Sequence, residues 1–371
     1  MLGAVSAPAA THRLLWPGLL AALLLAICAR ALAEYAGSAV FHAAKTPVSP
    51  VLVAILLGAL LRNVLLKRGL KLEAGLAVAT TTVLRLGIAL VGLKLTLAVV
   101  GKLGLYALPV VPLCMATAWY LAKWLAGPLQ LTRNLSLLLA VGTAVCGCTA
   151  VMAVAPLIRA NKDEMGYAVT CVVIFGVLAM LGYPWLAHWQ FAALPAAAGI
   201  FLGTAIHDTS QVMGAGLIYS QQFDAPIALA AATTAKLLRN LSMVVLVPWF
   251  AWMAAKSATT SERTLAPVQR PSMLTLVPPF VWAFVAFVVL RSVGDFSFET
   301  SPWASSWHAW MNNASTASDF LLTMGMAAVG LGISFGSFRG IGWRPLLAAM
   351  AIAISVGALS FAITTVVSHW M

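Results

Sequence analysis

A short stretch of this sequence, GTAIHDTSQVMGAG at residues 203–216, places His207 and Asp208 side by side in a long apolar run. Four basic residues lie in similar apolar surroundings: Arg85, Lys94, Lys236 and Arg239. A charged side chain in the middle of a membrane segment costs about 2.5–3.5 kcal/mol on insertion scales. Such residues face a cavity or one another, so they mark the positions where this chain can do chemistry.

Basic residues outnumber acidic ones in these segments, where Asp208 is the one carboxylate expected at mid-span. Lys236 and Arg239 are three residues apart and share one face of a helix. Lys94 is expected near the end of its segment, where its ammonium can reach the membrane surface. Asp208 pairing with Lys236 or Arg239 as a purely structural contact is one alternative. The cations left over, Arg85 among them, instead predict a small anion as the substrate.

Two glycine-rich stretches interrupt the apolar runs, VGTAVCGCTA at 141–150 and LGTAIHDTSQ at 202–211. A helix can unwind at such a stretch, and unwound backbone at membrane depth is tolerated where it lines a cavity or packs in protein. The freed N–H groups at the start of a half-helix bind anions. His207, with an unperturbed pKa of about 6.5, adds a group suited to a proton or substrate role. Packing of small residues explains the glycines as well, but it does not explain His207 and Asp208.

The surroundings of these residues indicate an all-α polytopic membrane protein. Of the 371 residues, 62% are apolar and 9% are charged, whereas soluble domains carry about 25% charged residues. A membrane-spanning helix needs about 20 apolar residues. The sequence predicts about eleven spans, near 14–33, 48–66, 76–98, 103–125, 135–157, 165–186, 193–218, 226–254, 274–293, 318–336 and 343–367.

The net charge of +12 predicts topology and does not indicate nucleic-acid binding, because the basic residues are scattered at span ends. With eleven spans, eleven basic residues fall on the side of the N-terminus and six on the other side. The positive-inside rule then predicts a cytoplasmic N-terminus and an exterior C-terminus. Residues 291–318, with three tryptophans, are expected to form an exterior loop. A cleaved secretory signal is the alternative for the first span, which ends in ARALA.

The cysteines predict neither a metal site nor a redox centre. All five lie in apolar spans, where a free cysteine behaves as a small hydrophobic residue. The pair Cys146 and Cys148 is too closely spaced for a C-x-x-C motif and lacks a second ligand pair for zinc. We therefore expect no metal. Because no nucleophile motif or metal cluster occurs in the sequence either, we expect no cofactor and no enzymatic activity.

Internal similarity suggests a duplicated architecture. GTAVCGCTAVM at 142–152 aligns with GTAIHDTSQVM at 203–213, and LRLGIALVGLKL at 84–95 resembles LTMGMAAVGLGI at 322–333. An odd number of spans in a repeat inverts the second copy in the membrane, as in many secondary transporters.

The span count fits one transporter domain over residues 1–371, made of a leading helix and two inverted five-helix repeats with broken helices at the midplane. The leading helix is expected at 14–33, the first repeat at 48–186 and the second at 193–367.

The chain resembles the YeiH-like family of sulfate exporters of bacterial inner membranes in six stretches, which occur in order: VLRLGIALVGLKLT (83–96), GTAVCGCTAVMAVAPLIRA (142–160), VVIFGVLAMLGYP (172–184), GIFLGTAIHDTSQVMGAG (199–216), AKLLRN (235–240) and DFLLTMGMAAVGLG (319–332). The resemblance implies an inner-membrane exporter of sulfate, sulfite or a small organosulfonate. The C-terminus is then periplasmic.

The substrate site that the resemblance and the glycine-rich stretches together imply consists of Arg85, Gly142, Thr143, Cys146, Gly147, His207, Asp208, Gln211, Lys236 and Arg239. The family pattern matches at each of these positions except Thr143, and also at Gly87. Departures from the pattern are expected to tune the substrate: Cys148, Thr149, Thr209 and Ser210.

Energetics favours export if sulfate is the substrate. With a negative interior, moving two negative charges outward gains about 4.6 kcal/mol per 100 mV, since each charge gains about 2.3. The alternatives are a cation/proton antiporter that uses Asp208, a membrane-embedded enzyme with His207 as general base, and a non-transporting sensor. The expected partners are a small anionic substrate and the lipid bilayer, without nucleic acid, and a homo-oligomer stays open.

Overall fold

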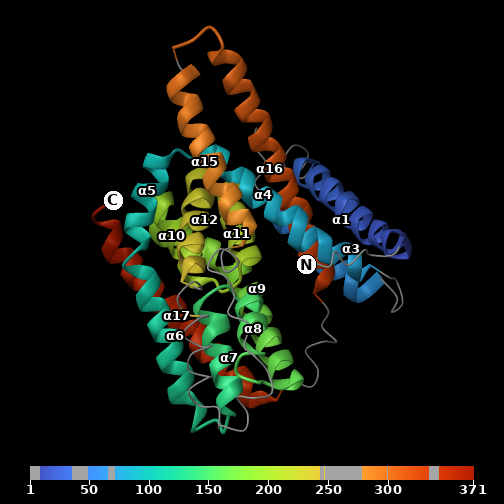
Figure 1. Ribbon diagram of the computed structural model, residues 1–371, viewed down its shortest axis with the longest axis vertical. Coiled ribbons are helices and arrows are strands. Elements are labelled where there is room, and N and C mark those ends of the chain that lie inside the picture. Colours follow the sequence, from blue (N-terminus) through green and yellow to red (C-terminus); the bar gives the residue numbers. More distant parts are fainter. Residues whose placement is uncertain are drawn as a thin grey trace, which may run out of the picture. The chain divides into compact units, whose positions relative to one another are not determined.

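Apolar runs of this sequence form helices, and no strand occurs in the part of the chain that the structure describes (Figure 1). This computed structural model describes residues 9–35, 49–65, 72–242, 246, 278–298, 300–333 and 342–371. Within a bilayer the backbone has no water to bond, and a helix satisfies its N–H and C=O groups internally. The predicted all-α fold class is confirmed.

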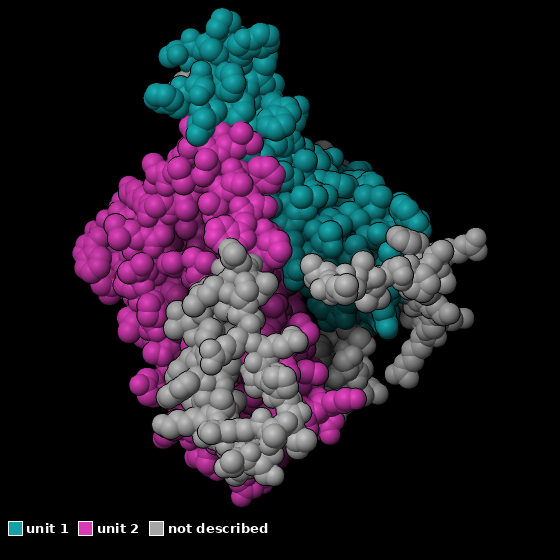
Figure 2. Space-filling model, viewed as in Figure 1, with its two compact units in different colours: residues 1–94, 293–337 teal, residues 95–292, 338–371 magenta. Residues whose placement is uncertain are grey.

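The chain forms two compact units, each made of two separate stretches of sequence (Figure 2). Unit 1 combines residues 1–94 with 293–337, and unit 2 combines residues 95–292 with 338–371. The division into a leading helix and two inverted repeats stays a prediction.

Unit 1 contains α1 (Ala9–Tyr35), α2 (Pro50–Leu60), α3 (Glu73–Val78), α4 (Leu84–Val91) and α16 (Ala304–Gly332). A π-helical turn, η3 (Ala79–Val83), joins α3 to α4, and a 3-10 turn, η4 (Gly92–Lys94), follows α4. A second π-helical turn, η2 (Leu61–Leu65), follows α2. Residues 73–94 thus form a single span.

Glycines allow α4 and α16 to pack closely. A Cβ atom at Gly87 would lie 3.1 Å from the Leu322 side chain, and one at Gly325 would lie 2.7 Å from that of Leu84. These glycines belong to the two similar segments of the sequence, LRLGIALVGLKL and LTMGMAAVGLGI. Both glycines serve this close packing of the two helices.

Unit 2 contains a series of consecutive helices: α5 (Leu97–Ala107), α6 (Val110–Ala126), α7 (Arg133–Ala144), α8 (Cys148–Val154), α9 (Lys162–Phe191), α10 (Pro195–Ala205), α11 (Thr209–Gln222) and α12 (Pro226–Leu241). It also contains α17 (Trp343–Ser368) and α15 (Pro279–Phe298) up to Ser292. Helices α9, α10 and α11 pack on one another, and α10 and α11 also pack on α12 (Figure 1). This packing positions the candidate site.

Six helices among the described residues are long and apolar enough to cross a membrane. Helices α5 and α6 add a seventh if this pair, bent by 40°, is one span. Pro50–Val64 and Pro195–Ala205 are shorter apolar helices. A polytopic membrane protein is confirmed, while the eleven spans and the sides of the termini stay predictions. The end of the predicted span 226–254 and residues 255–273 lie outside the described residues.

The expected exterior loop over residues 291–318 is wrong, because α15 continues to Phe298 and α16 already begins at Ala304. Trp307 of α16 packs on Phe298 with ring centroids 5.3 Å apart and donates a hydrogen bond of 2.8 Å to Asp295. Within this polar stretch the Thr316 hydroxyl donates to the carbonyl of Asn312 in the same helix at 3.0 Å. Polar composition alone did not reveal the helix.

Candidate helix-break site

Two helices of unit 2 are interrupted at corresponding positions. The first break, residues 145–147, separates α7 from α8, and the second break, residues 206–208, separates α10 from α11. In the alignment of GTAVCGCTAVM with GTAIHDTSQVM the two breaks coincide residue for residue. The prediction that the glycine-rich stretches unwind is confirmed.

Lys236 of α12 connects the two breaks. Its Nζ donates to the carbonyl oxygens of Val145 at 2.9 Å and Ile206 at 3.3 Å, and to that of His207. The side chain is fully buried. One ammonium group therefore bonds to the backbone of both interrupted helices.

Arg239, one helical turn after Lys236, does the same with its guanidinium. Its Nε donates to the carbonyl of Ala144 at 2.6 Å and its Nη2 to that of Thr143, at the end of α7. Its Nη1 donates to the carbonyls of Thr204 at 2.8 Å and Ile206 at 3.3 Å, at the end of α10. This side chain is also fully buried.

The partners of these two cations are backbone carbonyls, and among the described residues neither cation has an acidic partner, as the sequence predicts. The last four carbonyls of a helix have no partner within the helix, and the C-terminus carries about half a negative charge. Two helix ends that meet at one place supply negative charge for Lys236 and Arg239. The alternative of a structural ion pair with Asp208 is wrong, because neither cation forms an ion pair with this residue, and all three residues are described.

Asp208 instead caps α11. Its Oδ2 accepts hydrogen bonds from the backbone N–H of Ser210 at 3.0 Å and from the Ser210 hydroxyl. Gly147 of the first break lies directly against it, since a Cβ at Gly147 would be 2.7 Å from Asp208 Oδ1. Gly147 also has a positive φ of 66°, a conformation that glycine adopts without steric cost. Glycine is therefore required here by both backbone conformation and space.

Three buried polar atoms near the second break have no hydrogen-bond partner among the described residues: His207 Nδ1, Gln211 Oε1 and Asn240 Oδ1. The side chains retain 2%, 4% and 5% exposure respectively. Gln211 Nε2 donates to the carbonyl of Val173 in α9 at 3.3 Å, and Asn240 Nδ2 donates to Thr209 Oγ1 at 3.3 Å. Buried polar groups are nearly always paired, so these atoms identify a place where a ligand or water can bond.

The structure brings together all but one of the residues predicted for the site, on the broken helices and α12: Gly142, Thr143, Cys146, Gly147, His207, Asp208, Gln211, Lys236 and Arg239. Gly142 serves packing, since a Cβ there would meet Val172 and Val151 at under 3 Å, namely 2.8 and 2.9 Å. Thr143 contributes its carbonyl. Arg85 lies exposed at the start of α4 in unit 1, and its part in the site stays a prediction.

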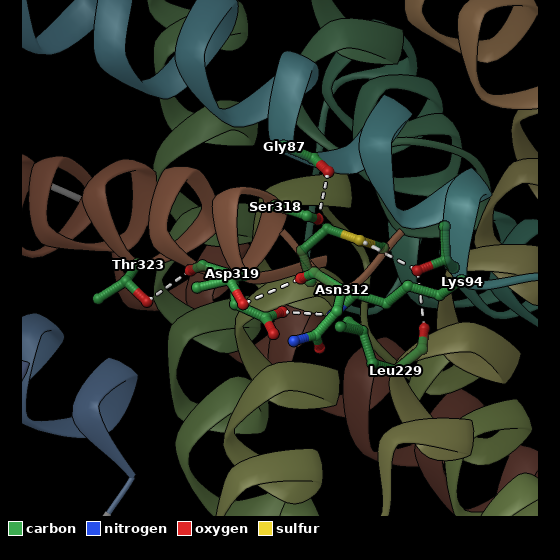
Figure 3. A network of polar contacts seen from close by, with 10 residues as sticks. Gly87, Lys94, Leu229, Asn312, Ser318, Asp319 and Thr323 are labelled. Carbon is green, nitrogen blue, oxygen red and sulfur yellow. Dashed lines mark hydrogen bonds and ion pairs between the residues drawn. The ribbon is translucent and has the colours of Figure 1, made fainter. Parts of the chain in front are cut away.

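Two polar residues were missed in the sequence. Asn240 directly follows Arg239 in AKLLRN, and this adjacency to a buried cation was the available signal. Asp319 of α16 forms an ion pair of 2.7 Å with Lys94 (Figure 3). Asp208 is therefore not the only carboxylate in an apolar helix. The position of Lys94 near the membrane surface stays a prediction. Its side chain is 17% exposed.

Long apolar helices with a polar centre at two helix breaks define the class of this molecule, a polytopic helical membrane protein. The chain belongs to the family described as Conserved hypothetical protein 698, whose sequence profile matches residues 17–349.

Curated relatives of this chain are named as membrane proteins, two of the three below as inner-membrane proteins. The chain is 32% identical over 322 residues to the UPF0324 inner membrane protein YeiH of Salmonella typhimurium, which covers 85% of each chain. It is 30% identical over 370 residues to YeiH of Escherichia coli, covering 96% of this chain and 97% of the relative. A UPF0324 membrane protein of Yersinia pestis is 31% identical over 286 residues, or 76% of this chain and 74% of the relative. No solved structure matches the chain. These matches support an inner-membrane protein.

Proposed function

We propose that this protein is a transporter that exports a small anion across the inner membrane. The observation that carries the proposal is the pair of helix breaks in unit 2, joined through Lys236 and Arg239. Interrupted helices at membrane depth are uncommon, because the freed backbone groups need partners. Secondary transporters use such interruptions to bind substrates and ions near the midplane.

The charge balance around the breaks favours an anion. Lys236 and Arg239 contribute two positive charges, whereas Asp208 contributes one negative charge. The backbone carbonyls neutralise the cations only in part, because a helix C-terminus carries about half a charge. An anion near the second break would also meet hydroxyl groups, since Thr209 and Ser210 begin α11 and are half-buried. In this arrangement Lys236 and Arg239 act through the backbone that they position.

The resemblance to the YeiH-like exporters supplies the substrate class, which is sulfate, sulfite or a small organosulfonate. A divalent anion leaves a cell with a negative interior spontaneously, at a gain of about 4.6 kcal/mol per 100 mV. The protein needs to provide a selective path, and the membrane potential provides the driving force.

Efflux from proteoliposomes tests the proposal. Purified full-length protein is reconstituted into liposomes loaded with radiolabelled sulfate, and a potassium gradient with valinomycin sets the interior negative. We expect sulfate efflux faster than from protein-free liposomes, and faster still as the interior becomes more negative. Sulfite and taurine inside the liposomes compete if they share the path, whereas chloride does not. Efflux equal to that of protein-free liposomes for all three sulfur compounds would overturn the proposal.

A further inference from the structure

Helix α9 provides a depth scale for unit 2. Its 30 residues, Lys162–Phe191, form one of the helices that are long and apolar enough to cross a membrane. At about 1.5 Å per residue this helix is about 45 Å long, whereas the apolar core of a bilayer is about 30 Å thick. A contact with a given residue of α9 therefore indicates the depth of the contacting residue in the membrane.

The first interrupted helix starts and finishes at one end of α9. Thr132, the N-cap of α7, donates a hydrogen bond to Glu164 in the first turn of α9. Further along α7, Gly142 lies against Val172, since a Cβ at Gly142 would be 2.8 Å from the Val172 side chain. Helix α7 therefore runs in the same direction as α9. After α8 the chain enters α9 through its N-cap Asn161, which is again at the end where α7 began.

The second interrupted helix starts and finishes at the opposite end of α9. Helix α10 follows α9 directly in the chain. Helix α11 then runs alongside α9 in the same direction, because Gln211 donates to the carbonyl of Val173 at 3.3 Å and Tyr219 lies beside His188 with ring centroids 5.9 Å apart. Phe223, which directly follows α11, stacks on His188 at 3.7 Å. Helix α11 therefore returns to the end of α9 from which α10 departs.

The two breaks meet at the same depth. Adjacent residues of α9, Val172 and Val173, contact α7 and α11 near their breaks. These two residues lie about 15 Å from the start of α9 and about 27 Å from its end. A Cβ at Gly147 would be 2.7 Å from Asp208, and Lys236 donates to the carbonyls of both breaks. The breaks are therefore in contact inside the membrane.

Basic residues distinguish the two ends of α9. The segment with α7 and α8 is flanked by four of them: Lys123, Arg133, Arg159 and Lys162. The segment with α10 and α11 lies in a stretch without lysine or arginine, between Lys162 and Lys236. Basic residues near the ends of membrane segments favour the cytoplasmic face. The end of α9 at Lys162 is therefore expected at the cytoplasmic face, and its other end at the periplasmic face.

We propose that α7–α8 and α10–α11 are two re-entrant hairpins, which enter the membrane from opposite faces and meet at their breaks. They replace the predicted spans 135–157 and 193–218. The α7–α8 hairpin starts and ends at the cytoplasmic face, and the α10–α11 hairpin starts and ends at the periplasmic face. Unwound backbone at this depth is tolerated because it is packed in protein. Each hairpin separates the helix-break site from one face and is the gate of that face, a role that rests on the proposed function.

Labelling of single cysteines in spheroplasts tests the hairpins without any transport. Exposed positions at the four hairpin ends are replaced in a full-length cysteine-free variant: Pro128→Cys, Lys162→Cys, Ala193→Cys and Asp224→Cys. A maleimide that does not cross membranes is applied before and after permeabilisation. We expect Ala193→Cys and Asp224→Cys to react in intact spheroplasts. Pro128→Cys and Lys162→Cys should react only after permeabilisation.

Lys162 and Ala193 decide between the hairpins and the predicted spans. Two full spans would place Lys162 at the periplasmic face and Ala193 at the cytoplasmic face, and would leave Pro128 and Asp224 where the hairpins place them. The latter two are therefore the matched controls. Lys162→Cys reacting in intact spheroplasts, or Ala193→Cys reacting only after permeabilisation, would overturn the hairpins. If the cysteine-free variant does not fold, a protease site inserted after Ala193 should be cut in spheroplasts, and one inserted after Arg159 should not.

A disulfide between α10 and α17 tests the gate. The hydroxyl oxygens of Thr204 and Ser360 are 2.7 Å apart, so cysteines at both positions can pair and fix the α10–α11 hairpin to α17. We expect oxidation of Thr204→Cys/Ser360→Cys with copper phenanthroline to stop sulfate efflux from proteoliposomes, and dithiothreitol to restore it. Thr204→Cys alone is the control and should not respond to the oxidant.

Equal efflux from the oxidised and the reduced double variant would overturn the gate. The labelling pattern needs no transport, so failure of the proposed function is separable from failure of the hairpins. The expected labelling without any sulfate efflux supports the hairpins and contradicts anion export.

Discussion

The two helix breaks of unit 2 share a position in the aligned sequence and differ in chemistry. The first break has Gly147 at its end, with a φ of 66° and no side-chain cap. The second break has Asp208 at the same position, in extended conformation with a φ of −91°, and its side chain caps α11. Lys236 and Arg239 bond to the carbonyls of both breaks. The shared contacts maintain the architecture, and the difference places the polar chemistry at the second break.

Replacing Arg239 should have the largest effect, because it serves both breaks at once. Arg239→Ala removes a donor from the carbonyls of Thr143, Ala144 and Thr204, whereas the Ile206 carbonyl keeps Lys236, and each unsatisfied buried group costs about 1–3 kcal/mol. We expect loss of several kcal/mol of stability, or failure to fold, in detergent unfolding assays. Lys102→Ala, at an exposed position of α5, is the matched control and should be neutral. Wild-type stability with loss of sulfate flux alone would restore Arg239 as a direct substrate ligand.

Gly147→Ala tests the first break separately. This position requires a positive φ, which is unfavourable for alanine, and the new Cβ would displace the Asp208 carboxylate. We therefore expect a loss of about 1–3 kcal/mol in the free energy of unfolding. Gly166→Ala is the control, since no atom lies within 4 Å of that Cβ position in α9, and alanine favours a helix. The comparison fails if the two variants unfold at the same temperature.

Two substitutions of Asp208 separate its role as a helix cap from the role of its charge at the second break. Asp208→Ala removes the cap of α11 and should cost about 0.5–2 kcal/mol, whereas asparagine caps nearly as well as aspartate. We therefore expect Asp208→Asn to unfold at a temperature close to that of the wild type and higher than that of Asp208→Ala. A loss of about 3–5 kcal/mol in Asp208→Asn would instead indicate a buried ion pair that the structure does not contain.

The smallest effect is expected for the ion pair of unit 1, which offers a contrast to Lys236. Lys94 and Asp319 are 2.7 Å apart, with side-chain exposures of 17% and 38% (Figure 3). Partly exposed pairs of this kind contribute about 0.2–1 kcal/mol. A double-mutant cycle of Lys94→Met and Asp319→Asn measures their coupling energy in unfolding. A coupling energy well above this range would show that this pair has a role that we assign to the helix breaks alone.

The positions of the helix breaks could be predicted because glycine, threonine and serine interrupt two apolar runs at aligned places. The shared face of Lys236 and Arg239 followed from their spacing of three residues. Their partners could not be predicted, since backbone carbonyls have no signature in the sequence. Asp319 was missed because it stands at the boundary of an apolar run that follows a polar stretch. That stretch is nevertheless helical, and a hydroxyl in it can bond to the carbonyl four residues earlier, as at Thr316.

Labelling of a cysteine beside the breaks tests most directly whether the substrate passes there. Cys148 begins α8, directly after the first break, and is half-buried, and a variant in which it is the sole cysteine reports on this place. The rate of its reaction with a maleimide is measured in proteoliposomes with increasing sulfate, and with chloride as the control. We expect saturable protection by sulfate and none by chloride. An unchanged labelling rate in proteoliposomes that export sulfate would contradict it.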